Sequence, residues 1–179
     1  MYFLEDDRIG LRRLEETDIE GPYAEWLNDE QVCRFNSHHR FPVSASELAE
    51  YIRGVNAGSR EMVFAVIEKN SKEHIGNISL QQINMTDRSA EIAFLFGNKA
   101  YWGNGYATDA GKLLIGHAFD ALGIHRIYFG TSEDNIAMQR VGEHLGFSKV
   151  GVRREALYKR GSYRDIVDYD LLETEWRAK

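Results

Sequence analysis

The sequence predicts an α/β (α+β) fold with one mixed, mostly antiparallel twisted sheet and helices on both of its faces. Its length of 179 residues suits one domain with a sizeable core, so we place residues 1–179 in a single domain. Short apolar segments follow one another between residues 62 and 96, separated by brief turns, and this order favours antiparallel hairpins. A strand–helix–strand crossover from Ala90 to Thr131 then predicts one parallel pair.

The first expected elements are a strand and a helix. Apolar and polar residues alternate over Arg8–Leu14, which is typical of a strand. Thr17 and Glu20 have the spacing of a capping box, so we expect a helix after them that carries Trp26.

A loop and a second helix come next. Gln31–Pro42 shows no clear periodicity and is expected to be a loop. Ser44 and Glu47 form a second capping-box pattern, which opens a helix that ends near Gly58.

The rest of the chain combines strands with two helices. Strands are predicted at Met62–Glu68, Ile75–Ile83, Ala90–Phe96, Arg126–Thr131, Ser148–Leu157 and Ile166–Leu172. Helices are predicted at Tyr106–Leu122 and from near Asp134 to Gly146, since glycine commonly follows the last turn of a helix. The expected order is therefore β-α-α-β-β-β-α-β-α-β-β.

The composition excludes several classes of function. The formal net charge is −6 and no basic run is present, so neither nucleic acid nor a membrane surface is an expected partner. No apolar run approaches the ~20 residues that cross a bilayer. The histidines and the lone Cys33 form no metal-binding motif, so we expect no metal. The single cysteine and the absence of an export-signal pattern indicate a cytoplasmic protein.

The segment Ser89–Gly111 carries the strongest functional signal. It is expected to run from a buried strand through a glycine-bearing loop into a helix. Gly103 and Gly105 would let a bulky anion approach the backbone, and a helix that begins near Tyr106 would point free N–H groups at that anion. A Walker loop would end in Gly-Lys-Ser/Thr, and a dinucleotide fingerprint would come earlier in the chain. The remaining alternative is a plain strand-to-helix turn.

Two motifs resemble the acyl-coenzyme A signature of the GNAT acetyltransferase superfamily. Gly105 and Ala107 fill the last two fixed places of the family loop, Gln/Arg-x-x-Gly-x-Gly/Ala. Trp102 stands in the first place, which departs from the superfamily consensus but is similar to the RimJ/RimL-like branch that acetylates ribosomal-protein N-termini. Asn135 and the Gly146-Phe147 pair match the second motif with the family spacing.

The resemblance implies acetyl transfer from acetyl-coenzyme A (acetyl-CoA) to a primary amine. It implies that the glycine loop holds the diphosphate and that the pantetheine arm pairs with a splayed strand, where a backbone N–H of Leu95 or Phe96 would donate to the thioester oxygen. For Arg140, plain surface charge is the alternative. The candidate cofactor-binding residues are Phe94, Leu95, Phe96, Trp102, Gly103, Asn104, Gly105, Tyr106, Ala107, Asn135 and Arg140.

Glu91 is the candidate catalytic base. An acceptor amine with a pKa of ~10 arrives mostly charged at neutral pH, so a base must take its proton. The strand around Glu91 resembles the one that carries the base glutamate of the histone-acetylating GNAT enzymes. Strand alternation places Glu91, Ala93 and Leu95 on one face, and apolar neighbours would raise the pKa of the carboxylate. The alternative is that Glu91 pairs with an arginine or caps a turn.

The general acid is less obvious. Many superfamily members supply a tyrosine four residues before the final glycine of the second motif, and this chain has Gly142 there. Tyr158 is the candidate catalytic replacement, and Tyr101 is the alternative. A coenzyme thiol with a pKa near ~8.5 can also leave with help from water alone.

The candidate substrate-binding residues are Trp26, His38, His39 and Arg40. In this fold the region between the first two helices roofs the acceptor site, and the run from Trp26 to Pro42 is similar to bacterial enzymes that acetylate nucleotide sugars. Arg40 suits a phosphate or carboxylate of the acceptor. Either histidine is an alternative base, and for each of them a solvated loop position is the competing interpretation.

The sequence therefore predicts an N-acetyltransferase that uses acetyl-CoA and works by direct attack in a ternary complex. The expected acceptor is a protein N-terminus or another small-molecule or peptide amine, with the amino group of a nucleotide sugar as an alternative. A non-catalytic acyl-CoA-binding module is the rival from another class, and Gly142 supports it. A homodimer is also compatible with the sequence.

Overall fold

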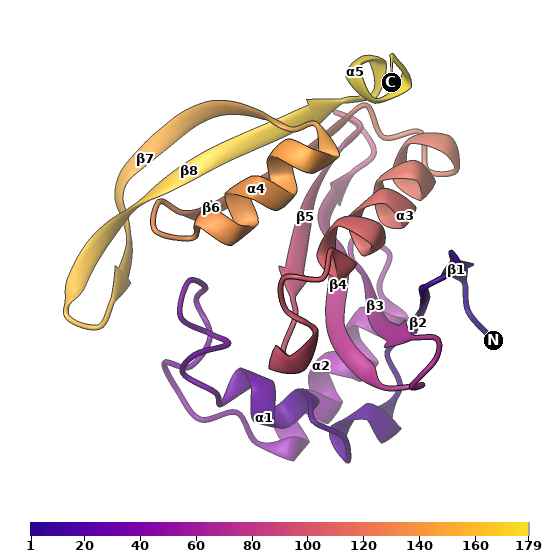
Figure 1. Ribbon diagram of the computed structural model, residues 1–179, viewed down its shortest axis with the longest axis vertical. Helices are drawn as coiled ribbons and strands as arrows, with labels where there is room; N and C mark the ends of the chain where they lie inside the picture. Colours follow the sequence, from indigo (N-terminus) through magenta and orange to yellow (C-terminus); the bar gives the residue numbers. More distant parts are fainter. Residues whose placement is uncertain (179) are drawn as a thin grey trace.

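The computed structural model describes residues 1–178, which contain an eight-stranded sheet in the order β1-β2-β3-β4-β5-β6-β8-β7 (Figure 1). The strands are β1 (Leu4–Glu5), β2 (Ile9–Arg13), β3 (Met62–Glu68), β4 (His74–Asn84), β5 (Ser89–Leu95), β6 (Arg126–Ser132), β7 (Ser148–Lys159) and β8 (Ser162–Leu172). The helices are α1 (Tyr23–Leu27), α2 (Ala45–Ala57), α3 (Tyr106–Asp120), α4 (Ile136–Leu145) and α5 (Glu173–Arg177), with 3-10 helices η1 (Glu16–Ile19) and η2 (Lys99–Tyr101). The predicted fold class is confirmed.

The one parallel pairing within residues 1–178 joins β5 to β6, as the crossover predicts. Its register links Ser89–Glu91 with Arg126–Tyr128 and ends there. After Glu91, β5 continues beside β4 alone, and after Tyr128, β6 continues beside β8 alone. The two strands therefore separate, and we call the opening between residues 92–95 and residues 129–132 the β5–β6 wedge.

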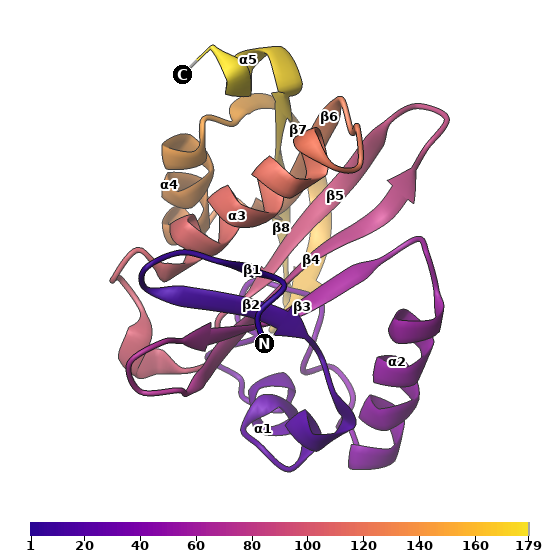
Figure 2. The ribbon, with the colours of Figure 1, turned by 90° about the vertical axis from the view of Figure 1, so that its right-hand side faces the viewer.

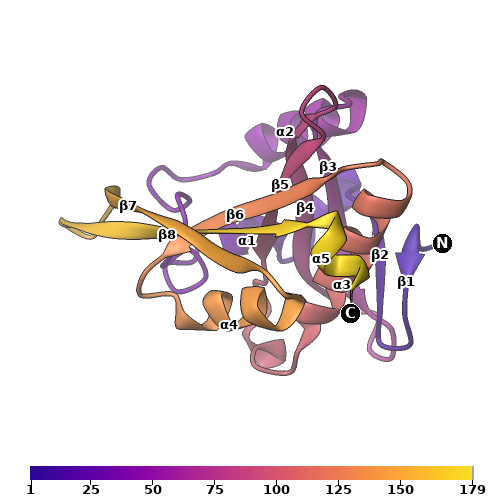
Figure 3. The same cartoon turned by 90° about the horizontal axis from the view of Figure 1, so that it is seen from above.

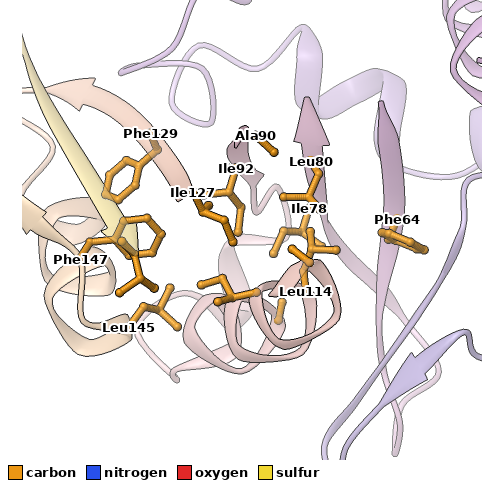
Figure 4. Packing of buried hydrophobic residues seen from close by; sticks show 14 of the residues in the cluster. Phe64, Ile78, Leu80, Ala90, Ile92, Leu114, Ile127, Phe129, Leu145 and Phe147 are labelled. Carbon is orange, nitrogen blue, oxygen red and sulfur yellow. The ribbon is translucent and has the colours of Figure 1, made fainter. Parts of the chain in front are cut away.

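Helices cover the sheet on both faces, α3 and α4 on one and α1 and α2 on the other (Figures 2 and 3). Strand β3 shows the division, since Phe64 and Val66 join the cluster beneath α3 and α4, whereas Val63 and Ala65 join the cluster beneath α1 and α2. Figure 4 shows the first cluster, with Leu114 of α3 packed among side chains of the sheet. The sheet is thus buried on both faces over its N-terminal half.

The predicted capping box at Thr17 and Glu20 is wrong. The box is formed by Glu15 and Asp18, and it opens η1 rather than an α-helix. Asp18 is drawn into this role because its buried carboxylate also accepts hydrogen bonds from both terminal nitrogens of Arg12, at 2.8 and 2.6 Å. The helix that carries Trp26 begins only after Pro22. The second predicted box, at Ser44 and Glu47, is confirmed at the start of α2.

The C-terminal hairpin is longer than predicted. Strand β7 reaches Lys159 and β8 begins at Ser162, instead of Leu157 and Ile166. Arg160 and Gly161 connect them with φ angles of 50° and 76°, and two positive values in a two-residue connection are typical of a type I′ turn. The tip of this hairpin projects from the body of the molecule (Figure 1).

Two short elements, β1 and α5, lie outside the predicted order. Trp176 of α5 packs against Phe119, with ring centroids 6.2 Å apart, and so fixes this short helix to the domain. Among the described helices, none has the combined length and apolar character of a bilayer-spanning segment. Residues 1–178 also contain no group of three or more His, Cys, Asp or Glu side chains placed to hold a metal ion.

Candidate active site

The loop between η2 and α3 presents a row of main-chain N–H groups. Gly103 and Gly105 have φ angles of 76° and 84°, a region that favours glycine. Gly105 precedes the first turn of α3 without a side chain that caps it, so the N–H groups of residues 106–108 have no acceptor within the described chain. A Cβ placed on Gly103 would meet nothing within 4 Å, so the loop is open in front. This arrangement fits a phosphate group, as the resemblance implies for the coenzyme.

Trp102 fastens this loop to the end of β5. Its indole N–H donates to the carbonyl oxygen of Phe96 at 2.7 Å. The side-chain amide of Asn104 donates a hydrogen bond within the loop, to the carbonyl oxygen of Trp102 at 3.3 Å. The loop and the strand end are therefore held in one geometry, which aligns the predicted diphosphate site with the predicted pantetheine strand.

Arg8 is a residue at this loop that sequence reasoning missed. Its guanidinium donates to the carboxylate of Asp109 at 2.7 Å and to the carbonyl oxygen of Asn104 at 2.9 Å, and it lies 4.2 Å from the centre of the Tyr106 ring. The side chain is 46% exposed, so the positive charge faces solvent beside the free N–H groups. No local motif connects Arg8 to a loop 96 residues further along the chain.

Strand β5 follows the predicted alternation. Ile92, Phe94 and Phe96 pack toward the α3–α4 cluster, whereas Leu95 packs toward the α1–α2 cluster. Backbone groups of a strand point alternately to its two neighbours, and β5 has no strand on its β6 side after Glu91. The β5–β6 wedge thus leaves main-chain groups free to pair with an extended ligand.

Asn135 caps α4, next to the wedge. Its side-chain oxygen accepts the N–H of Met138 at 3.3 Å, and its side-chain nitrogen donates to the hydroxyl of Thr131 on β6 at 3.0 Å. Arg140, further along α4, is exposed and makes no hydrogen bond or ion pair within residues 1–178. Asn135 is thus a positioning element between β6 and α4, whereas Arg140 is a free cation.

Gly142 lies against an aromatic cluster. A Cβ at this position would come within 2.6 Å of Cζ of Phe129. Phe129 in turn stacks on Tyr169 and meets Phe147 edge-on, with centroid separations of 5.0 Å in both pairs (Figure 4 shows Phe129 and Phe147). The ring of Phe129 therefore occupies the space that a side chain at position 142 would need.

Glu91 lies on the face of the sheet opposite α3 and α4, beside the start of the wedge. Its register partner on β6 is Tyr128, and both point away from the cluster that takes up Ile92. Gln82 donates a hydrogen bond to the carboxylate at 2.9 Å. Glu91 forms no ion pair within residues 1–178, so the alternative of a pairing with arginine is not what the structure shows.

The neighbours of Glu91 set its acidity. Desolvation raises the pKa of the Glu91 carboxyl group, while the nearby charge of Arg153 and the hydrogen bond from Gln82 act in the opposite direction. Arg153 is itself held by Asp168, whose two carboxylate oxygens accept its Nε and one Nη at 2.8 and 2.9 Å. A raised pKa brings a glutamate closer to the range in which it can accept a proton at neutral pH.

The two tyrosines considered as acids differ in surroundings. Tyr158 lies on the projecting hairpin, 52% exposed, with its ring 5.0 Å from that of Tyr163. The hydroxyl of Tyr101 is already engaged, since it donates to the carboxylate of Glu73 and lies 3.0 Å from the hydroxyl oxygen of Ser71. The catalytic role of Tyr158 stays a prediction.

The loop Gln31–Pro42, which we call the acceptor loop, lies against the tip of the β7–β8 hairpin. Arg40 donates to the carbonyl oxygen of Tyr158 at 3.0 Å, and the ammonium group of Lys159 donates to the carbonyl oxygens of Asn36 and His38. His39 is exposed with a φ of 56°. The structure thus brings Arg40, His38 and Tyr158 together.

Trp26 is set apart from these loop residues. It is only 5% exposed, and its indole packs edge-on against His74 with centroids 4.9 Å apart. A Cβ on Gly97 would come within 2.0 Å of the Trp26 ring, so the ring packs directly against the backbone that follows β5.

Comparison with known proteins places the chain in a family. The family model of the acetyltransferase (GNAT) domain matches residues 8–148, so the chain belongs to the GNAT acetyltransferases. Among curated relatives, the uncharacterized N-acetyltransferase YoaA of Bacillus subtilis is 28% identical over 171 residues, which cover 95% of this chain and 96% of YoaA.

Solved structures share the fold. A spermidine N-acetyltransferase from Vibrio cholerae, in complex with CoA and spermine, has a TM-score of 0.88 at 24% identity and covers 96% of this chain and 99% of its own. Mycobacterium smegmatis RimJ, in complex with CoA-disulfide, has a TM-score of 0.83 at 21% identity and covers 93% of this chain and 83% of its own. At 24% and 21% identity, these two likenesses show that the fold is shared. The protein is an N-acetyltransferase that uses acetyl-CoA to acetylate an amine.

Proposed function

We propose that this enzyme acetylates a primary amine by direct attack, with Glu91 as the general base. The observation that carries the proposal is the position of Glu91: a partly desolvated carboxylate without an ion-pair partner, beside the wedge and on the face of the sheet opposite α3 and α4. A covalent intermediate on Cys33 has no support, because this thiol is buried, donates to the carbonyl oxygen of Trp26 at 3.2 Å and has a pKa raised by desolvation.

Each part of the site has one proposed task. Acetyl-CoA supplies a thioester whose carbonyl carbon accepts the amine. The N–H groups of residues 103–108, with Arg140 as an outlying cation, hold the diphosphate. Main-chain groups of residues 94–96 align the pantetheine arm and donate to the oxygen that gains negative charge. Asn135 keeps α4 in place beside this arm.

The proposed reaction requires two proton transfers, one from the amine and one to the leaving thiol. Glu91 takes a proton from the bound ammonium group, so that the nitrogen lone pair is free to form the C–N bond. The C–S bond breaks, its electron pair stays on sulfur, and the thiol gains a proton. With glycine at position 142, we assign this second proton to solvent or to Tyr158.

The acceptor is proposed more coarsely. One structural neighbour is described as a spermidine enzyme and another is RimJ, so both small-molecule and peptide amines are candidates. His38, His39 and Arg40 would contact the acceptor, with Trp26 supporting the site from within. We further propose that residues 1–179 act as one domain in the cytoplasm, and that a homodimer is the assembly to test first.

Free thiol released from acetyl-CoA tests the proposal directly. The protein is incubated with acetyl-CoA and a panel of amines: spermidine, short peptides and amino sugars. We expect saturable thiol release that depends on the amine. Saturable coenzyme binding without turnover on any amine would instead support a non-catalytic acyl-CoA-binding module, which the glycine at position 142 favours. If the protein shows no coenzyme binding and no thiol release, both the acetyltransferase and the binding-module hypotheses are refuted.

A further inference from the structure

A small cavity lies between the acceptor loop, the β7–β8 hairpin and the end of β6. Its volume is about 120 Å³, enough for a group of a few heavy atoms. The charged residues in its wall are Arg34, Lys159, Arg160, Arg164 and Asp134. The wall therefore carries four cations and one carboxylate in a chain whose formal net charge is −6. We call it the basic cavity.

Two of the four cations lack a carboxylate partner. Arg164 is paired with Asp134 at 2.7 Å, and Arg160 with Glu30 at 2.5 Å. Arg34 makes no ion pair within residues 1–178 and stacks over the ring of Phe35, 5.0 Å from its centre. Lys159 donates only to main-chain carbonyl oxygens, and desolvation together with neighbouring positive charges lowers its pKa.

Ser132 supplies an independent observation. It lies in the wall of the basic cavity, is 1% exposed, and its hydroxyl has no hydrogen-bond partner within residues 1–178. Asn77 Nδ2 is the one fully buried side-chain N or O atom without a partner within residues 1–178, so the Ser132 hydroxyl is accessible from the basic cavity and can donate to an occupant. An oxyanion in the cavity would accept from this hydroxyl and balance the two unpaired cations.

The basic cavity and Glu91 lie on the same side of β6, with the Arg153–Asp168 ion pair packed over Gly130 between them. Tyr128, Gly130 and Ser132 alternate onto the same face of β6, and Tyr128 is the register partner of Glu91. Four residues of strand separate Tyr128 from Ser132, which is roughly 13 Å at 3.3 Å per residue. An acceptor that passes over the Arg153–Asp168 pair can therefore place its amine at Glu91 and a second group in the basic cavity.

From these contacts we infer that the acceptor is an amine with an anionic group, a carboxylate or a phosphate, roughly 10–13 Å from its reacting nitrogen. The inference rests on the proposed function and narrows its substrate class. A polyamine is disfavoured, since its second ammonium group would meet Arg34 and Lys159. Guanidinium groups match carboxylate and phosphate oxygens with paired donors, which makes either anion a suitable occupant.

Matched acceptor pairs test the inference. Ser-Ala-Glu-amide is compared with Ser-Ala-Gln-amide, and Ser-Ala-phosphoserine-amide with Ser-Ala-Ser-amide, because in each anionic peptide the charged group lies roughly 10 Å from the terminal amine. Spermidine is the cationic reference. We expect kcat/KM to be at least tenfold higher for the anionic member of one pair, mainly through KM, and the pair that responds identifies carboxylate or phosphate as the source. Equal values in both pairs, or a preference for spermidine, would overturn the inference and leave N-acetylation intact.

Arg34→Gln is the informative variant. We expect it to reduce the anionic-to-neutral ratio of kcat/KM to about a third or less of its wild-type value. Lys149→Gln is the matched control, because Lys149 is exposed on β7 and makes no ion pair within residues 1–178. Lys149→Gln should keep the wild-type ratio of kcat/KM between anionic and neutral acceptors. An equal fall of this ratio in both variants would show that net charge, and not the basic cavity, causes the preference, and would contradict the inference.

Binding keeps the test decisive if no amine is turned over. The melting temperature is measured with Ser-Ala-phosphoserine-amide and with Ser-Ala-Ser-amide, and the same is done with the glutamate and glutamine peptides. We expect a rise for wild type with the anionic member of a pair and a smaller rise for Arg34→Gln. No rise with either anionic compound would refute the basic cavity as an anion site, whatever the outcome for catalysis.

Discussion

The two halves of the site are built in different ways. On the coenzyme side, residues 103–108 supply main-chain N–H groups from one continuous segment, and glycine geometry at two positions exposes them. On the acceptor side, Glu91, Arg153 and Asp168 are side chains from three strands, and the basic cavity adds the acceptor loop. A site formed by main-chain groups of one segment can be recognised from the local sequence, whereas a site formed by side chains of several segments depends on tertiary packing. Substitutions should therefore affect the two halves through different quantities.

The largest effect is expected for Glu91→Gln, on the acceptor side. The substitution keeps the shape and the contact with Gln82 but removes the base, so kcat should fall by about 10²–10⁴-fold. Acetyl-CoA affinity, measured by titration, should stay within twofold. The exposed Glu50 on α2 provides the control, and Glu50→Gln should leave kcat unchanged.

The pH profile sharpens the same prediction. Only the deprotonated carboxylate accepts a proton, and the pKa of Glu91 is raised, so wild-type kcat/KM should decline as pH falls through a value above that of an ordinary glutamate. Glu91→Gln should lose this limb of the profile. A wild-type profile that Glu91→Gln reproduces at all pH values would assign the base elsewhere, with His38 or His39 next in line.

A smaller effect is expected for Gly105→Ala, on the coenzyme side. The φ of 84° costs a non-glycine residue about 1–2 kcal/mol, so the melting temperature should fall and the KM for acetyl-CoA should rise. A steric clash is not the cause of this effect, since the new Cβ would lie at an ordinary van der Waals distance of 3.7 Å from an Arg8 nitrogen. Gly116→Ala in the same helix is the control: its Cβ meets nothing within 4 Å, and it should stabilise the protein by about 0.5–1 kcal/mol. Equal behaviour of both variants would contradict the backbone account.

The smallest effect is expected for Arg8→Gln, which removes a side chain from the half built of backbone. A half-exposed ion pair contributes about 0.2–1 kcal/mol, so the KM for acetyl-CoA should rise by at most about fivefold, and less at high salt. Arg53→Gln removes a similar pair, with Glu16 at 3.0 Å, and should not change this KM. A loss above tenfold would show that the coenzyme side depends on a side chain after all.

The same contrast explains what the sequence could predict. The glycine loop and the strand with Glu91 were predictable because their function requires a local order of residues. The positions of Arg8, Arg34 and Arg153 were not, since each acts only after distant segments have packed. Locally, the capping box at Thr17 failed because Asp18 is bound by Arg12 of β2, a contact that no local pattern announces.

The aromatic ring at position 129 has a consequence for how this enzyme can change. Installing a tyrosine at residue 142 alone would drive its first carbon into that ring, and trimming the ring alone would leave a void beside α4. Each single step is expected to lower the melting temperature, whereas Gly142→Tyr combined with Phe129→Ala should recover part of the loss. The side chains at positions 129 and 142 are therefore coupled, since a larger residue at one requires a smaller residue at the other.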